Sequence, residues 1–147
     1  MALSSENEFT CDQTAPDLVR RYLRGAALSP LFLHGNALDV LTSLPQDSVD
    51  CCMTSPPYWG HRQYAEDGIG LEDEHVAYVH SLVAILNRVG RVLKPSGSLW
   101  LNIGDTYENK HLVGVPWRVA LSLIDEHGWI LRNDVIWHKV KGAQTAP

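Results

Sequence analysis

Short apolar runs alternate along this sequence with longer segments in which apolar residues recur every three or four positions. Because buried strands are short and apolar while helices are longer and periodic, this alternation predicts a series of strands and helices. The strands are predicted at 31–34, 48–54, 98–103 and 129–137, and the helices at 17–27, 37–44, 73–93 and 116–126. Nearly continuous apolar strands are typical of a mostly parallel sheet covered by helices on both faces, which binds ligands beyond the carboxyl ends of its strands.

The size and composition indicate one soluble domain with its own core. Of the 147 residues, 45% are hydrophobic and 20% charged, and no apolar run approaches the roughly 20 residues of a membrane helix. The polar N-terminus lacks the pattern of a signal peptide, and an odd number of cysteines, Cys11, Cys51 and Cys52, fits no disulfide framework. We therefore expect a protein of the reducing cytoplasm, away from membranes, with Cys51 or Cys52 facing the core.

The net charge is −5, which argues mildly against a protein that grips nucleic acid by itself. Lys and Arg supply most contacts to phosphate groups, so an acidic chain needs other help to hold DNA or RNA.

A double proline directly follows the predicted strand at 48–54. The tetrapeptide Ser55-Pro56-Pro57-Tyr58 cannot continue that strand, because proline lacks the N–H that a sheet ladder needs. Taken alone, these residues also fit a proline-rich turn or a ligand for a proline-binding domain. Their position at the carboxyl end of a predicted parallel strand favours a functional site instead.

Residues 54–59, Thr-Ser-Pro-Pro-Tyr-Trp, resemble the catalytic motif of DNA methyltransferases that modify exocyclic amino groups. The resemblance extends in the family's order over roughly residues 31–139, and its other segments are 33–37, 44–50, 70–72, 91–105, 115–120 and 134–139. It implies the N-terminal catalytic half of such an enzyme, with an α/β fold. That fold is a partial Rossmann-like, S-adenosylmethionine-dependent methyltransferase fold with a mostly parallel sheet and flanking helices. The implied divisions are a lead-in with a short helix at 1–28, the catalytic half at 29–139 and a flexible tail at 140–147.

The chemistry of the motif agrees with this resemblance. The amino nitrogen of cytosine or adenine is a poor nucleophile, because its lone pair is delocalised into the ring. Acceptors that bind the amino hydrogens return that lone pair to nitrogen, and the Ser55 hydroxyl and the Pro56 carbonyl are suitable acceptors. Pro56 and Pro57 keep the backbone rigid, and Tyr58 can stack on a base flipped out of the duplex. These four residues are the predicted catalytic residues.

Serine at the first position of the motif, rather than aspartate, directs the resemblance toward cytosine N4, with adenine N6 as the alternative. Methylation of cytosine carbon 5 is disfavoured, because its cysteine nucleophile typically follows a proline and this chain has no Pro-Cys pair. The resemblance further implies S-adenosylmethionine as cofactor, DNA as substrate and a role in restriction-modification. RNA stays open as an alternative substrate.

The resemblance places Gly35, Asn36 and Ser55 near the cofactor. The family usually carries Gly-Asp where this chain has Gly35-Asn36, so Asn36 is interpreted either as a cofactor-binding residue or simply as a turn residue. The further candidates for the pocket are Trp59, Glu72 and Asp105. The glutamate fits equally well in the first turn of the long helix, and the aspartate in a turn or cap.

No metal site is predicted. His75 and His80 lie five positions apart, which is off one helical face, and no Cys or Glu completes a ligand set. Trp100, Trp117 and Trp129 fall in apolar patterns and are predicted to belong to the core.

The Asp-Pro-Phe-x-Gly-x-Gly cofactor loop of the family has no equivalent among the 11 glycines of the chain. We therefore expect either a second polypeptide that carries the cofactor loop and the target-recognition region, or self-association. The competing hypothesis is a non-catalytic, truncated interaction module, whose unfinished sheet presents an open edge and an apolar face. Ser55→Ala discriminates between these hypotheses, because it abolishes methylation under the first and changes nothing under the second.

Overall fold

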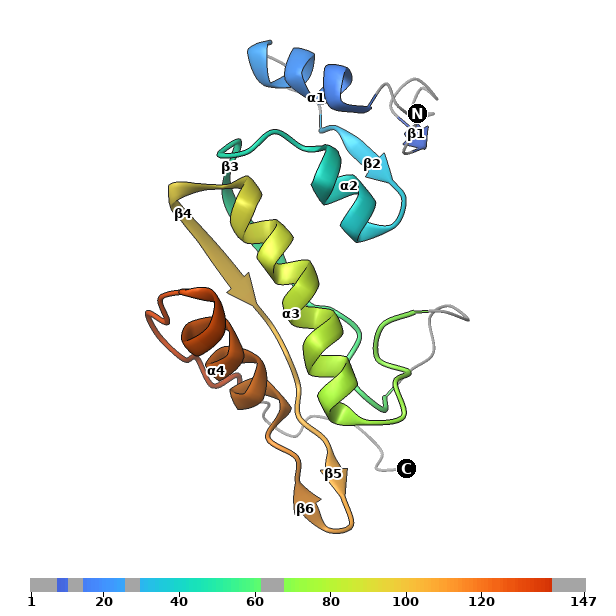
Figure 1. Cartoon of the computed structure of the whole chain (residues 1–147), viewed down its shortest axis with the longest axis vertical. Coiled ribbons are helices and arrows are strands. Elements are labelled where there is room, and N and C mark those ends of the chain that lie inside the picture. The colour runs from blue at the N-terminus through green and yellow to red at the C-terminus, as the bar shows by residue number, and fades with distance from the viewer. Residues whose placement is uncertain (1–7, 11–14, 26–29, 62–67, 139–147) are drawn as a thin grey trace.

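The computed structural model describes residues 8–10, 15–25, 30–61 and 68–138, and its strands and helices alternate as the sequence predicts (Figure 1). In chain order the elements are β1 (Glu8–Thr10), α1 (Ala15–Arg24), β2 (Phe32–His34), α2 (Ala37–Ser43), β3 (Val49–Thr54), α3 (His75–Val92), β4 (Leu93–Leu101), β5 (Tyr107–Glu108), β6 (His111–Leu112) and α4 (Val115–His127). The sequence does not predict β1 or the β5–β6 hairpin, which are only two or three residues per strand. The expected tail at 140–147 lies outside the described residues.

The described strands form three separate pairs. β1 pairs with β2 and β3 pairs with β4, both in parallel, whereas β5 and β6 form an antiparallel hairpin. The arrows of β2 and β4 point the same way in Figure 1. Within the described part of the chain, no ladder joins β2 to β3.

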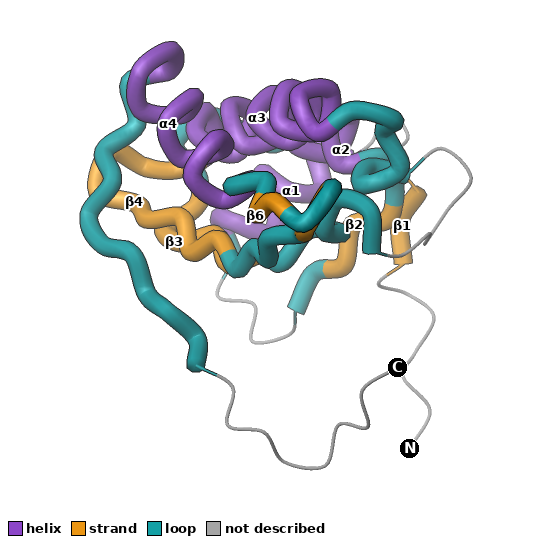
Figure 2. The backbone as a smooth tube through the Cα atoms, turned by 90° about the horizontal axis from the view of Figure 1, so that it is seen from below, coloured by secondary structure: helices purple, strands orange, loops and turns teal. Residues whose placement is uncertain are grey.

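Helices cover only one face of β3 and β4. Figure 2 shows α2, α3 and α4 together on one side of these strands. On the other side Met53 is 79% exposed and its register partner Trp100 is 57% exposed. The prediction of helices on both faces is therefore wrong for β3 and β4 among the described residues, because α2, α3 and α4 all lie on the same side of these strands.

The core lies between α3, α4 and the covered face of β4. Its buried residues are Tyr78, Val79, Leu82, Val83 and Leu86 of α3 with Val115, Val119 and Leu123 of α4. From β4 and the residues after it, Leu99, Leu101 and Ile103 pack against this cluster. The three- and four-residue spacing along α3 thus forms an apolar face, as the sequence predicts.

The connection from α3 to β4 is shorter than the sequence predicts. The sequence predicts a helix that ends at 93 and a strand that begins at 98, but Leu93 both caps α3 and begins β4. The ladder tolerates Pro95 because its register with β3 shifts between Val49 and Cys51, so that a residue without an N–H interrupts no regular pairing.

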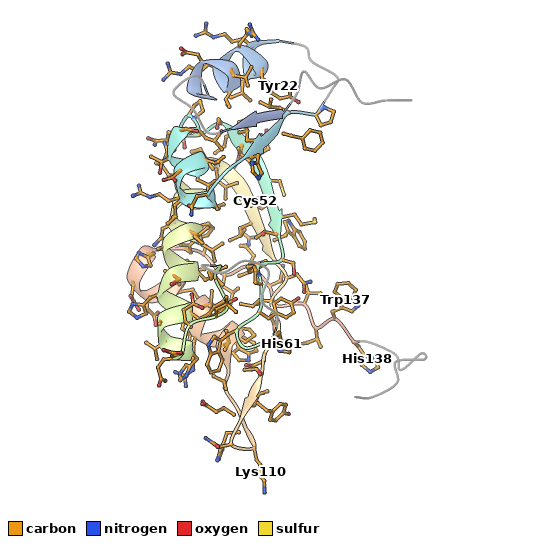
Figure 3. All side chains as sticks on the ribbon, turned by 90° about the vertical axis from the view of Figure 1, so that its right-hand side faces the viewer. Tyr22, Cys52, His61, Lys110, Trp137 and His138 are labelled. Atoms are coloured by element: carbon orange, nitrogen blue, oxygen red, sulfur yellow. The ribbon has the colours of Figure 1, made fainter. Side chains whose placement is uncertain are left out.

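The predicted strand at 129–137 is wrong. Residues 129–138 form no strand, and they do not pair with the open outer edge of β3 or of β4. The first residue is held against α3: the Trp129 indole donates to Asn87 at 3.2 Å, and its ring lies against Gly90. Beyond it the side chains are exposed, and Figure 3 shows Trp137 on the side away from α3.

The tryptophan predictions divide in the same way. Trp129 packs against the core as predicted, but Trp100 on β4 and Trp117 on α4, at 57% and 52% exposed, are not core residues. Trp100 alternates with the inward-facing residues of β4, and a strand's alternation necessarily turns one residue in two away from the covered face.

Helix α2 is held at both ends. The Asn36 side chain caps its N-terminus. At its C-terminal end one guanidinium nitrogen of Arg91 donates to the carbonyls of Leu41, Thr42 and Leu44 at 2.6, 3.2 and 2.7 Å. Among the described helices none is long and apolar enough to cross a bilayer.

Candidate active site

The Ser55–Gly60 loop begins where β3 ends. The last ladder contact is the Asn102 N–H, which donates to the Thr54 carbonyl at 2.9 Å. Beyond that point the prolines end the pairing, as predicted, and Ser55 is exposed while Pro56, Pro57 and Tyr58 are half-buried. The motif therefore lies at the surface of the carboxyl end of the strand, rather than inside the hydrophobic interior.

Tyr58 and Ser55 face each other across this loop. The Ser55 Oγ and the Tyr58 hydroxyl lie 3.3 Å apart, within hydrogen-bond distance. The Tyr58 ring stands edge-on to the His61 ring, with centroids 5.9 Å apart. It also lies against Gly104, where an added Cβ would fall 2.7 Å from two of its ring carbons. A side chain at position 104 would collide with the Tyr58 ring, so this position requires glycine.

Helix α3 and the residues before it anchor the loop from behind. The Tyr78 hydroxyl donates to the Pro57 carbonyl at 2.8 Å, and the Trp59 indole donates to the Glu72 carbonyl at 2.8 Å. Burial raises the pKa of Tyr78 well above its usual range, and the nearby charges of Glu72 and then of Tyr58 raise it further. The Tyr78 hydroxyl therefore stays protonated and able to donate.

Two predicted pocket residues have their carboxylates engaged in the fold. Asp105 accepts from the N–H groups of Thr106, Gly114 and Val115 at 2.9 to 3.0 Å, so it caps the N-terminus of α4. Glu72 accepts from the Gly70 N–H at 2.8 Å. The structure thus favours the cap interpretation of Asp105, and it places Glu72 in the turn before α3.

Gly35 and Asn36 follow β2 and are exposed. The Asn36 Oδ1 accepts from the Leu38 N–H at 2.9 Å, which is the turn and cap role that was the alternative to cofactor binding. No hydrogen bond among the described residues joins Gly35 or Asn36 to the Ser55 loop. The structure brings together Ser55, Tyr58 and Gly104, and of the three predicted cofactor residues only Ser55 belongs to this group.

Within the described part of the chain, no group of three or more His, Cys, Asp or Glu residues could hold a metal ion.

A family model described as DNA methylase matches residues 49–146. The chain belongs to this family. The match includes the Ser55 loop, α3, β4 and α4, and it confirms the resemblance that the sequence shows to DNA methyltransferases acting on amino groups.

Curated relatives in this DNA methylase family are type II methyltransferases. M.XycI of Xanthomonas campestris pv. cyanopsidis is 42% identical over 84% of this chain, and M.Cfr9I of Citrobacter freundii is 39% identical over 80% of it. The chain spans about half the length of these relatives, 52% of the first and 47% of the second.

A solved structure of a PvuII DNA methyltransferase, described as cytosine-N4-specific, resembles this member of the family. It superposes with a TM-score of 0.54 and 31% sequence identity, over 65% of this chain and 33% of that one. The predicted α/β methyltransferase fold, with a parallel sheet and flanking helices, is thereby confirmed.

Sequence reasoning missed Tyr78 and Gly104 as parts of the candidate site. Tyr78 occupies a core position of the periodic helix. The only signal for its role in the site is its hydroxyl among aliphatic residues, because a buried tyrosine needs a hydrogen-bond partner. Gly104 was visible as a glycine that ends a strand segment, but the ring that it accommodates is 46 positions earlier in the sequence.

Proposed function

We propose that this chain forms the target-base half of a DNA methyltransferase that modifies an exocyclic amino group, with cytosine N4 as the target. The observation that carries the proposal is the surface loop Ser55–Tyr58 at the carboxyl end of β3, braced from behind and open in front. The relatives' type II methyltransferase names and the cytosine-N4 specificity in the description of the PvuII structure support it. The division of the chain at 29–139 is part of the same proposal.

The loop provides two acceptors for the amino group of a flipped base. The Pro57 carbonyl already accepts from Tyr78, whereas no described group donates to the Pro56 carbonyl. One amino hydrogen of the base would bond to the Pro56 carbonyl and the other to the Ser55 Oγ, which localises the nitrogen lone pair. Tyr58, backed by Gly104, would stack on the ring of the base.

The described residues do not complete a site for S-adenosylmethionine, which, when bound, would supply a methyl group carried on a sulfonium. The Asn36 Oδ1 is engaged as a helix cap. Of the described glycines, Gly70, Gly90, Gly97 and Gly104 are packed against the protein's own atoms, whereas Gly60, Gly114 and Gly128 have open space where a Cβ would lie. We propose that residues outside the described ones take part in cofactor binding.

We propose that a further polypeptide segment completes the sheet between β2 and β3. These strands end in the two candidate regions of the site and belong to separate pairs whose arrows run in the same direction (Figure 1). One additional strand between them would join the pairs and bring Asn36 and Ser55 to the same edge of one sheet. A second polypeptide is the proposed source, and self-association is the alternative.

The test is reconstitution with the missing half of a relative. The chain is mixed with the C-terminal half of M.XycI, DNA and S-adenosylmethionine labelled in its methyl group, and the digested DNA is analysed by mass spectrometry. We expect labelled 4-methylcytosine from the mixture and none from either half alone. Labelled 6-methyladenine would move the target to adenine N6, and no product with this or any homologous half would contradict the proposal.

Ser55→Ala tests the loop within the same assay. We expect it to lower transfer by about 100-fold, since it removes a preorganised acceptor from the reacting group. Ser96→Ala is the matched control, because Ser96 is exposed on β4 at the end that does not lead into the site. The non-catalytic interaction module, which the exposed Met53 and Trp100 favour, predicts association of the two halves without any transfer.

A further inference from the structure

We propose that the Tyr78 hydroxyl is a positioning group that sets the orientation of the Pro57–Tyr58 peptide and thereby holds the Tyr58 ring in place for the flipped base. This inference rests on the proposed function, since it assigns a task to a residue that never touches the DNA. Tyr78 is fully buried in the first turn of α3 and lies 21 positions beyond its partner in the loop.

The loop has little capacity to brace itself. Pro56 and Pro57 have no N–H groups, so neither can donate a hydrogen bond that would close a turn. Each pyrrolidine ring fixes φ, which leaves ψ as the soft torsion of Pro57. That torsion decides where the Pro57 carbonyl points, and the hydrogen bond from the Tyr78 hydroxyl at 2.8 Å fixes it.

Fixing one carbonyl places the next residue. The Pro57 carbonyl and the Tyr58 N–H belong to one planar peptide, so holding the oxygen also sets the direction in which Tyr58 leaves the loop. On its other side Tyr58 meets Gly104, where a methyl group would fall 2.7 Å from the ring. The position of the Tyr58 ring is thus fixed from two sides. The Tyr78 hydroxyl holds the backbone before it, and the missing side chain of Gly104 leaves the space that the ring fills.

A third contact keeps the same segment from sliding. Gly70, at a positive φ of 98°, lies so close that an added Cβ would fall 3.2 Å from the Tyr58 carbonyl and 3.3 Å from the Pro57 Cβ. The Trp59 indole is meanwhile bound to the Glu72 carbonyl. Because these contacts limit translation of the loop, loss of the Tyr78 bond is expected to release a rotation of one peptide rather than to unfold the whole loop.

Tyr78→Phe removes this hydroxyl and little else. Its first readout needs no catalysis: DNA with 2-aminopurine at the target position becomes fluorescent when the base leaves the stack, and Tyr58 quenches it by stacking. In the reconstituted complex we expect the stacked, quenched fraction to fall by about tenfold, as loss of one buried hydrogen bond implies. We also expect kcat to fall by about tenfold, with the KM for DNA changed by less than about twofold.

Leu86→Ala is the control for lost stability. Leu86 is buried on the same helix, two turns beyond Tyr78, and its side chain has no hydrogen-bonding group. It should destabilise the complex at least as much as Tyr78→Phe while leaving kcat unchanged below the unfolding temperature. Equal losses of kcat in the two variants would assign the effect to general destabilisation and overturn the inference.

A measurement on the unaltered chain covers the case in which Tyr78→Phe does not fold. The hydrogen bond predicts a slowly exchanging Tyr78 hydroxyl proton in the NMR spectrum, coupled to the labelled Pro57 carbonyl carbon. Rapid exchange would overturn the inference.

If methyl transfer by the unaltered complex is seen and Tyr78→Phe matches it, the positioning role fails while the proposed function stands. If no complex transfers methyl groups, the proposed function fails, although the NMR signal still reports the bond.

Discussion

The two faces of the β3–β4 pair differ in what their alternating residues meet. Toward α3 and α4, Leu99 and Leu101 pack against the buried cluster. Away from the helices, Met53 and Trp100 lie side by side in register and are mostly exposed. The same short ribbon therefore supplies stability from one face and an uncovered apolar surface from the other. The core is one-sided, and the second face is available for association.

The largest effect should come from the covered side. Leu82→Ala removes a side chain that is 2% exposed between α3 and α4, and we expect it to lower the free energy of unfolding by ~2–5 kcal/mol. Met53→Ala, on the open face, should change it by no more than about 0.5 kcal/mol. Chemical denaturation of the isolated chain measures both. Losses of similar size would show that the open face is covered in solution.

The next largest loss of stability should come from Asp105, which follows β4 and caps the N-terminus of α4. Asp105→Asn weakens the acceptor of three backbone N–H groups and should cost ~1–2 kcal/mol, with faster hydrogen exchange in the first turn of α4. Asp125→Asn, an exposed change in the last turn of the same helix, is the control and should be neutral. An unchanged exchange rate near Val115 would argue against the cap.

The adjacent cysteines compare the two faces directly. Cys51 is exposed on the open face, whereas Cys52 is half-buried, and burial together with the neighbouring Cys51 raises the pKa of the Cys52 thiol. In a Cys11→Ser background, a thiol reagent should modify Cys51 about tenfold faster than Cys52. Mass spectrometry of the peptides identifies the site. Equal rates would mean that the two faces are equally accessible.

The smallest expected change is a loss of folding stability in alkaline solution. A raised pKa means that the folded state keeps its proton after the unfolded chain has lost it, so stability is fully present below the ordinary pKa and declines as pH rises above it. Cys52 should begin this decline above pH about 8.5 and Tyr78 should add to it above pH about 10. Tyr78→Phe should remove the second component only. Denaturation at a series of pH values separates the two, and an unchanged slope in that variant would contradict the assignment.

Much of the fold could be predicted because local pattern decides it. The apolar spacing of residues 73–93 requires a helix with one buried face, and the Pro56–Pro57 pair has to end β3. The errors arise where an element depends on a distant partner. The run at 129–137 has the composition of a strand, but a strand forms only beside another, and this run pairs with none of the described strands.

The candidate site shows the same division. The position of Ser55 and Tyr58 at a strand's carboxyl end follows from local sequence, as does the turn role of Asn36, whose side chain accepts from the nearby Leu38 N–H. A role of Asn36 in cofactor binding stays a prediction. The Tyr78 hydroxyl and the Gly104 gap could not be predicted, because each is defined by an atom brought near by tertiary packing.

The grip of Arg91 on α2 has a consequence for the order in which the chain assembles. This helix has seven residues, none of them buried, and is too short to persist by itself in water. Its last carbonyls are satisfied by a guanidinium that lies 47 to 50 positions further along. We therefore expect α2 to form only once α3 is in place, so that a fragment ending before Arg91 should lack this helix although it contains all of its residues.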